Sequence, residues 1–132
     1  MGHEASGTIH SIGSGVSSVS VGDRVAIEPG TPCRFCAACK NGTYHLCRQM
    51  RFAAAPGPPD TQGTLCRFFR ISEDFVYKID EMISLEEAVL VEPTSVAVHA
   101  VKLADVRPGE TVVVMGSGES RTPFYRCVLL QH

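Results

Sequence analysis

The chain has 132 residues, a net charge of −2 at pH 7 and charged residues at 20% of its length. This size suits one modest domain with its own core, and the balance of acids and bases gives no surface typical of nucleic-acid or membrane binding. The apolar runs are far too short to span a bilayer, and the N-terminus lacks the basic and apolar stretches of a secretory signal. We therefore expect a cytoplasmic protein with no nucleic-acid and no membrane partner.

Glycines punctuate the start of the chain and separate short runs of β-forming residues. We expect strands at Gly7–Ile12 and at Arg24–Glu28, the second following a turn at Gly22-Asp23. Short strands with tight corners indicate a small β-barrel or sandwich.

Four cysteines follow in an irregular stretch, residues 30–50. Cys33, Cys36, Cys39 and Cys47 form the pattern C-x2-C-x2-C-x7-C. Four thiolates this close together offer the tetrahedral sulfur ligands typical of zinc or of an iron–sulfur centre. Four protein ligands close the coordination sphere, so a zinc ion held there would be structural.

Two alternatives to zinc are open for this cluster. Bacterial ferredoxins use C-x2-C-x2-C-x3-C followed by proline, whereas here the fourth cysteine lies eight positions after the third and Arg48 follows it, which favours zinc. A brown, visibly absorbing protein would support the iron–sulfur alternative. Disulfides are the other alternative, but close thiols in a chain without a secretory signal favour a metal.

The middle of the chain predicts a loop and two more strands. Ala53–Asp60 is rich in alanine, proline and glycine and reads as a loop. Leu65–Ile71 and Phe75–Ile79 are rich in β-branched and aromatic residues and predict strands.

The last part predicts helices and one strand. Ser84 with Glu87 three residues on forms a capping box that begins a helix, which Pro93 interrupts. A second helix is predicted from about Thr94 to Leu103, and Thr111–Met115 predicts a compact apolar strand. Val96, His99, Ala100 and Leu103 should lie together on one face of the second helix.

Several sequence motifs occur together in one order along the chain. Residues 2–16 read G-H-E-x2-G-x5-G-x2-V, the cysteine lobe follows, and Val21–Val25 and Leu90–Pro93 add further matches. With these motifs the chain resembles the zinc-containing medium-chain alcohol dehydrogenase family, from Gly2 to about Gly118. Glu28–Gly30, Phe52–Pro56 and Gly63–Leu65 are similar to its polyol branch, which includes xylitol dehydrogenase (D-xylulose reductase), sorbitol and L-arabinitol dehydrogenases.

The resemblance implies a mainly β fold with α (α+β). Residues 1–91 would form part of a GroES-like catalytic barrel with a zinc lobe at 30–50, and residues 92–118 a linker helix and the first strand and turn of a Rossmann domain. Residues 119–132 do not resemble the family and form a non-family tail.

The resemblance also implies roles for individual residues. His3 and Glu4 would bind a catalytic zinc, with Glu92 beside it, and Phe52 would line a polyol pocket. Gly116 and Gly118 would belong to the turn that binds NAD or NADP, and the four cysteines would hold the structural zinc. The family reaction is the reversible oxidation of a polyol to a ketose, by enzymes that commonly form homo-oligomers.

The chain departs from the family at both ends, as a fragment would. The family's upstream cysteine ligand of the catalytic zinc is missing, and Arg121 stands where the third glycine of the dinucleotide fingerprint is expected. We therefore expect the isolated chain to be catalytically inactive. The alternative function is a non-catalytic zinc-binding module that associates with a full-length subunit.

Overall fold

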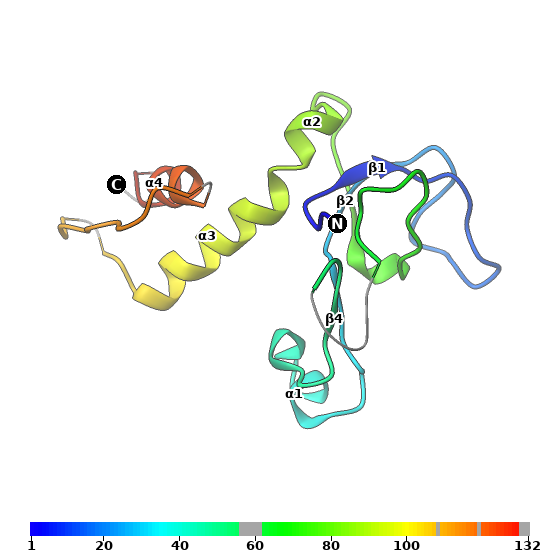
Figure 1. Cartoon of the computed structure of the whole chain (residues 1–132), viewed down its shortest axis with the longest axis horizontal. Coiled ribbons are helices and arrows are strands. Elements are labelled where there is room, and N and C mark those ends of the chain that lie inside the picture. The colour runs from blue at the N-terminus through cyan, green and yellow to red at the C-terminus, as the bar shows by residue number, and fades with distance from the viewer. Residues whose placement is uncertain (56–61, 108, 119, 130–132) are drawn as a thin grey trace. The chain divides into compact units, whose positions relative to one another are not determined.

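The computed structural model describes residues 1–55, 62–107, 109–118 and 120–129, and it divides the chain into two compact units (Figure 1). The first unit runs from Met1 to Val89 and the second from Leu90 to His132. The cysteine cluster lies wholly within the first unit.

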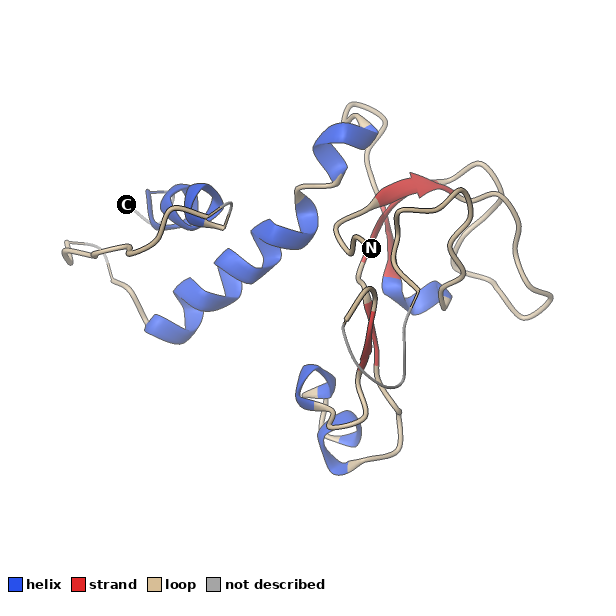
Figure 2. Ribbon diagram, in the orientation of Figure 1, coloured by secondary structure: helices blue, strands red, loops and turns tan. Residues whose placement is uncertain are grey.

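A three-stranded antiparallel sheet is the centre of the first unit (Figure 2). Its order is β1 (Ser6–Thr8), β2 (Arg24–Ile27) and β5 (Val76–Lys78). Val25 and Ala26 of the central strand are only 3% and 2% exposed, because this strand has neighbours on both sides. The described residues form small sheets and short helices without a closed barrel, which confirms the predicted α+β class and the incomplete barrel.

A second, two-stranded ribbon joins the sheet to the cysteine lobe. In it β3 (Gly30–Thr31) pairs antiparallel with β4 (Arg51–Phe52). The pairing brings the two ends of the lobe together. Between them lie α1 (Ala37–Lys40) and the 3-10 turn η1 (Tyr44–Leu46).

The strand predictions have mixed outcomes. Arg24–Glu28 is confirmed as β2, and Phe75–Ile79 is confirmed as β5 after a short 3-10 turn, η2 (Glu73–Phe75). Gly7–Ile12 is shifted toward the N-terminus, since β1 ends at Thr8 although the Ile9 N–H still donates to the Asp23 carbonyl.

The strand predicted at Leu65–Ile71 is wrong. This segment pairs with no strand among the described residues, and the Leu65 N–H donates instead to the Met1 carbonyl at 2.9 Å. β-forming residues make a strand only where a neighbouring strand accepts their hydrogen bonds. Of the loop predicted at 53–60, positions 56–60 lie outside the described residues.

The segment 66–71 instead forms one wall of a groove of about 800 Å³ in the first unit. Residues 5–13 form another wall. The groove also has an apolar lining of aliphatic side chains, which come from Val16, Val19, Val25, Ile27 and Val76.

The first unit ends in α2 (Leu85–Ala88), a helix of one turn. Its predicted capping box is confirmed, because the Ser84 hydroxyl accepts from the Glu87 N–H and the Glu87 carboxylate accepts from the Ser84 N–H. The Ser6 hydroxyl donates to the Leu85 carbonyl at 2.7 Å and so fixes the helix to β1.

In the second unit α3 (Val91–Ala104) packs against α4 (Arg121–Leu129). Pro93 lies in the first turn of α3, where proline is tolerated, so the helix begins before it rather than after it. Asp105, in the left-handed conformation with φ 49°, ends the helix.

The face of α3 that carries Val96, His99, Ala100 and Leu103 is not the buried face of the helix. Val96 and Leu103 are 52% and 74% exposed, whereas the buried residues are Pro93, Ala97 and Val101. These three are spaced four residues apart and share one helix face. Thr111–Met115 forms no ladder with any strand of the described chain, and its Val113 is 80% exposed. Within the described ranges no helix combines the length and apolarity needed to cross a bilayer.

Candidate metal centre

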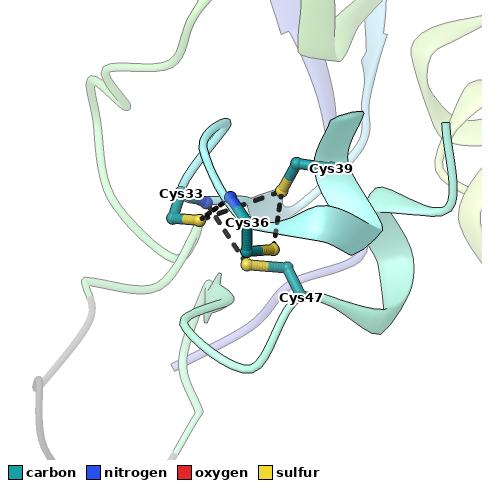
Figure 3. A group of neighbouring side chains, drawn as sticks. All are labelled: Cys33, Cys36, Cys39 and Cys47. Carbon is teal, nitrogen blue, oxygen red and sulfur yellow. Dashed lines mark hydrogen bonds between the residues drawn. The ribbon is translucent and has the colours of Figure 1, made fainter. Parts of the chain in front are cut away.

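Short elements of the lobe bring the four predicted cysteines together. Cys33 follows β3, Cys36 caps the N-terminus of α1, Cys39 lies within α1 and Cys47 ends η1. Figure 3 shows the four side chains pointing toward a common centre. The sequence alone places the four cysteines in one loop, and the fold turns their side chains toward one point.

The spacing of the sulfur atoms suits one metal ion. The Sγ atom of Cys39 lies 3.5 Å from that of Cys36 and 3.9 Å from that of Cys33. All four sulfur atoms lie within 4.8 Å of one another. With Zn–S bonds of about 2.3 Å, the corners of a regular tetrahedron are about 3.8 Å apart. The donor set and its spacing therefore fit zinc.

Backbone N–H groups also point at the sulfur atoms. The Sγ atom of Cys33 accepts from the N–H groups of Phe35 and Cys36, and the Sγ atom of Cys47 accepts from the N–H of Cys33. These donors stabilise negative charge on sulfur. The N–H groups of Phe35 and Cys36 lower the pKa of Cys33 to about 6.

The remaining thiols do not share this support equally. Burial, and then the neighbouring Cys36 thiol, raises the pKa of Cys39. Cys47 is buried, while the other three are half-buried. A bound divalent cation offsets the raised pKa of Cys39, because a coordinated thiol loses its proton.

Side chains outside the cluster attach the lobe to the sheet. The Glu28 carboxylate accepts from the Tyr44 hydroxyl at 2.9 Å and from the Tyr77 hydroxyl at 2.6 Å. Arg34 of the lobe forms a 2.8 Å ion pair with Asp74, and its guanidinium lies 5.5 Å from the centre of the Phe75 ring. The sequence motifs do not predict these contacts. Tyr44 lies between two of the cysteines, but nothing in the sequence pairs it with Glu28.

His3 and Glu4, predicted as catalytic ligands, lie in an N-terminal segment that is hydrogen-bonded to the rest of the first unit. The Thr64 N–H donates to the Gly2 carbonyl at 2.8 Å. The His3 ring lies 5.3 Å from the ring of Phe52, the predicted pocket residue. Both His3 and Glu4 are half-buried, and Phe52 does not line the large groove.

The other predicted site residues lie in the second unit. Glu92 is half-buried in the first turn of α3. Gly116, with φ 130°, and Gly118 lie in the exposed segment before α4. His3 and Glu4 belong to the first unit and Glu92 to the second, and the three stay a predicted ligand set.

Comparison with known proteins places this geometry in a family. The family model of the alcohol dehydrogenase GroES-like domain matches residues 1–81. The D-xylulose reductase A of Aspergillus oryzae is 55% identical over 118 residues, which cover 89% of this chain. The chain spans only 32% of that relative.

Solved structures of dehydrogenases are also similar to this chain. An oxidoreductase/dehydrogenase of unknown specificity from Escherichia coli is 36% identical, with a TM-score of 0.90 over 98% of this chain and 37% of its own. Galactitol-1-phosphate dehydrogenase from Escherichia coli is 28% identical, with a TM-score of 0.87 over 98% of this chain and 36% of its own. The chain therefore belongs to the alcohol dehydrogenases with a GroES-like domain.

Proposed function

We propose that the chain is part of the catalytic domain of a zinc-dependent polyol dehydrogenase, and that its cysteine lobe holds a structural zinc. The observation that carries the proposal is the convergence of four sulfur atoms within 4.8 Å of one another. The substrate class, a polyol such as xylitol and its ketose, rests on the similarity to D-xylulose reductases.

We assign the catalytic metal to His3, Glu4 and Glu92. An imidazole nitrogen and two carboxylates are ligands that zinc accepts. A zinc ion held there supplies Lewis-acid chemistry, which lowers the pKa of a substrate hydroxyl. His3 offers a nitrogen ligand, and Phe52, 5.3 Å from its ring, provides an apolar wall for the carbon chain of a polyol.

The residues of the second unit do not fit NAD or NADP. A dinucleotide site needs a strand, a glycine turn and a helix packed closely together. Thr111–Met115 pairs with no strand in the described part of the chain, and Arg121 occupies the third glycine position. We therefore propose that residues 1–132 alone turn over no polyol.

Metal analysis and an activity assay test these assignments separately. We expect about one zinc per chain, lost in Cys36→Ser and retained in the matched control Cys66→Ser, because Cys66 lies outside the cluster. Xylitol or sorbitol with NAD should give no turnover above blank. A zinc-free wild-type protein would contradict the metal assignment, and measurable turnover would contradict the inactivity.

The groove in the first unit favours a second candidate function, association with a full-length subunit. Apolar residues of β2 and β5 line about 800 Å³ of open space there. Gel filtration of the chain with and without a complete homologue separates the two candidates. Co-elution supports a binding module, and independent elution supports a monomeric fragment.

A further inference from the structure

Asn41 and Gly42 form the exposed turn between the third and fourth cysteines of the lobe. Asn41 is the only asparagine in the chain. Asn-Gly pairs in open chains lose ammonia readily, because glycine has no side chain to hinder attack by its own nitrogen. We propose that Asn41 is a deamidation site which a bound metal protects. Loss of the metal then leads to an irreversible chemical change in the lobe, the conversion of Asn41 to aspartate or isoaspartate. The proposal rests on the structural metal proposed above.

The chemistry needs only water. The backbone nitrogen of Gly42 attacks the side-chain carbonyl carbon of Asn41, and a carbon–nitrogen bond forms while the bond to the amide nitrogen breaks. The Gly42 N–H proton passes to a base, and the amide nitrogen takes up a proton and leaves as ammonia. Water then opens the five-membered imide at either carbonyl, which gives aspartate or isoaspartate.

The folded turn opposes the first of these steps. Asn41 has ψ 4°, which places the Gly42 nitrogen beside the backbone nitrogen of Asn41 and away from its side chain. The Gly42 N–H also donates to the Cys39 carbonyl at 3.2 Å. Attack requires rotation about ψ, and this rotation breaks that hydrogen bond.

Neighbouring hydrogen bonds resist the same rotation. The Asn41 N–H donates to the Ala37 carbonyl at 2.9 Å, and the N–H and hydroxyl of Thr43 both donate to the Ala38 carbonyl, at 2.9 and 3.1 Å. All these acceptors belong to α1, the helix that carries Cys39. The turn is therefore held as long as α1 is formed.

A bound metal is what keeps α1 formed. A four-residue helix is not stable by itself in water. Within residues 31–50 only Pro32 and Cys47 are buried, so little apolar burial supports it. The bonds from the metal to Cys36 and Cys39 supply the missing constraint, and their removal frees the Asn41-Gly42 peptide to rotate.

Isoaspartate would make the loss permanent. It adds one methylene to the backbone between Cys39 and Cys47 and so changes the path that brings these two ligands together. Metal added afterwards should then bind poorly. Loss of the metal is therefore reversible for a short time, until isoaspartate has formed, and irreversible later.

The test follows one peptide by mass spectrometry after metal content has been measured. The full chain is aged at mildly alkaline pH with a phosphine reductant, either with zinc or with a chelator, and peptide mapping separates asparagine, aspartate and isoaspartate at position 41. Breaking two or three hydrogen bonds corresponds to a rate difference on the order of tenfold or more. We expect that difference for wild type and for Cys66→Ser, whereas Cys36→Ser should react quickly in both solutions.

Zinc is then added back to the aged chains. Asn41→Gln, whose longer side chain cyclises far more slowly, should recover its zinc, and aged wild type should not. Equal deamidation rates with and without bound zinc would overturn the proposal, as would an intact Asn41 in the chelated chain. If the metal analysis finds that the chain binds no zinc, the proposal of a structural metal is itself contradicted. A chain that binds zinc but shows no protection removes this inference alone.

Discussion

Glu28 is one of the residues that connect the cysteine lobe to the sheet. Its two carboxylate oxygens accept from Tyr44, which lies in the lobe, and from Tyr77, which lies in β5. The Tyr44 ring also stands edge-on to Phe75 at 5.8 Å. One carboxylate therefore aligns side chains that are far apart in the sequence.

Replacing either tyrosine by phenylalanine tests how much its hydrogen bond to Glu28 contributes to the free energy of unfolding. We expect Tyr44→Phe to lower the free energy of unfolding by about 1 kcal/mol, since hydrogen bonds to charged groups contribute somewhat more than neutral ones and part of this one is exposed. Tyr77→Phe should cost less, because Tyr77 is 50% exposed. Urea unfolding gives both values, with Tyr125→Phe in the other unit as the control. Equal stabilities for all three variants would show that Glu28 contributes nothing.

The contacts of Glu73 predict that the stability of the fold depends on pH. Its carboxylate accepts from the Ser18 hydroxyl and from the N–H groups of Ser17 and Ser18. The Ser18 hydroxyl, followed by these N–H groups, lowers the pKa of Glu73. A lowered folded-state pKa contributes stability above the unfolded value of about 4.3, and that stability is lost as pH falls through the folded-state pKa.

The variant Glu73→Gln isolates this contribution. We expect it to be less stable than wild type near neutral pH and to approach wild type as pH falls below about 4 toward the lowered pKa of the folded state, where the carboxyl becomes protonated. Urea midpoints measured across this range give the difference. A difference that does not change with pH would mean that the charge of Glu73 has no part in it.

At the scale of elements, local signals were predictable and long-range pairings were not. The capping box at Ser84 and Glu87 and the strand at Arg24–Ile27 were predicted, because their causes lie within a few residues. The strand predicted at Leu65–Ile71 was wrong, because a strand needs a partner. The buried face of α3 was not predicted, because burial depends on a neighbouring element. In the metal centre the spacing predicted the four ligands, whereas the Glu28 contacts depend on tertiary packing.

The cap of α2 gives a prediction at this scale. Ser84→Ala removes the acceptor of the Glu87 N–H, and we expect a loss of about 1 kcal/mol, the usual effect of an N-cap change. Ser95→Ala in α3 is a matched control, because the Ser95 hydroxyl only donates back to the Glu92 carbonyl within the helix. Thermal unfolding compares the two. If Ser95→Ala cost as much as Ser84→Ala, the capping explanation would be wrong.

The whole molecule combines a sheet held by its own packing with a lobe that needs a metal. The central strand of the sheet is almost completely buried, whereas the lobe exposes Phe35 by 80% and Leu46 by 65%. Such a lobe depends on the free energy of metal binding, on the order of 10–16 kcal/mol for structural zinc sites. Metal loss should therefore open one region and leave the rest folded.

Limited proteolysis should detect this local opening. With a chelator, we expect trypsin to cut rapidly at Arg34, Lys40 and Arg48, which lie in the lobe, while Lys102 in α3 stays resistant. Adding zinc before the protease should restore protection. A cleavage pattern unaffected by the chelator would contradict a metal-dependent lobe.

The unpaired segment Thr111–Met115 has a consequence inside a cell. Its Val113 and Met115 are 80% and 91% exposed, in a run of β-branched residues with no ladder partner in the described chain. Chaperone holdases bind extended apolar peptides of this kind, and proteases remove what they retain. We expect the abundance of this chain to be governed by quality control, so that its half-life lengthens when Val113 is replaced by lysine.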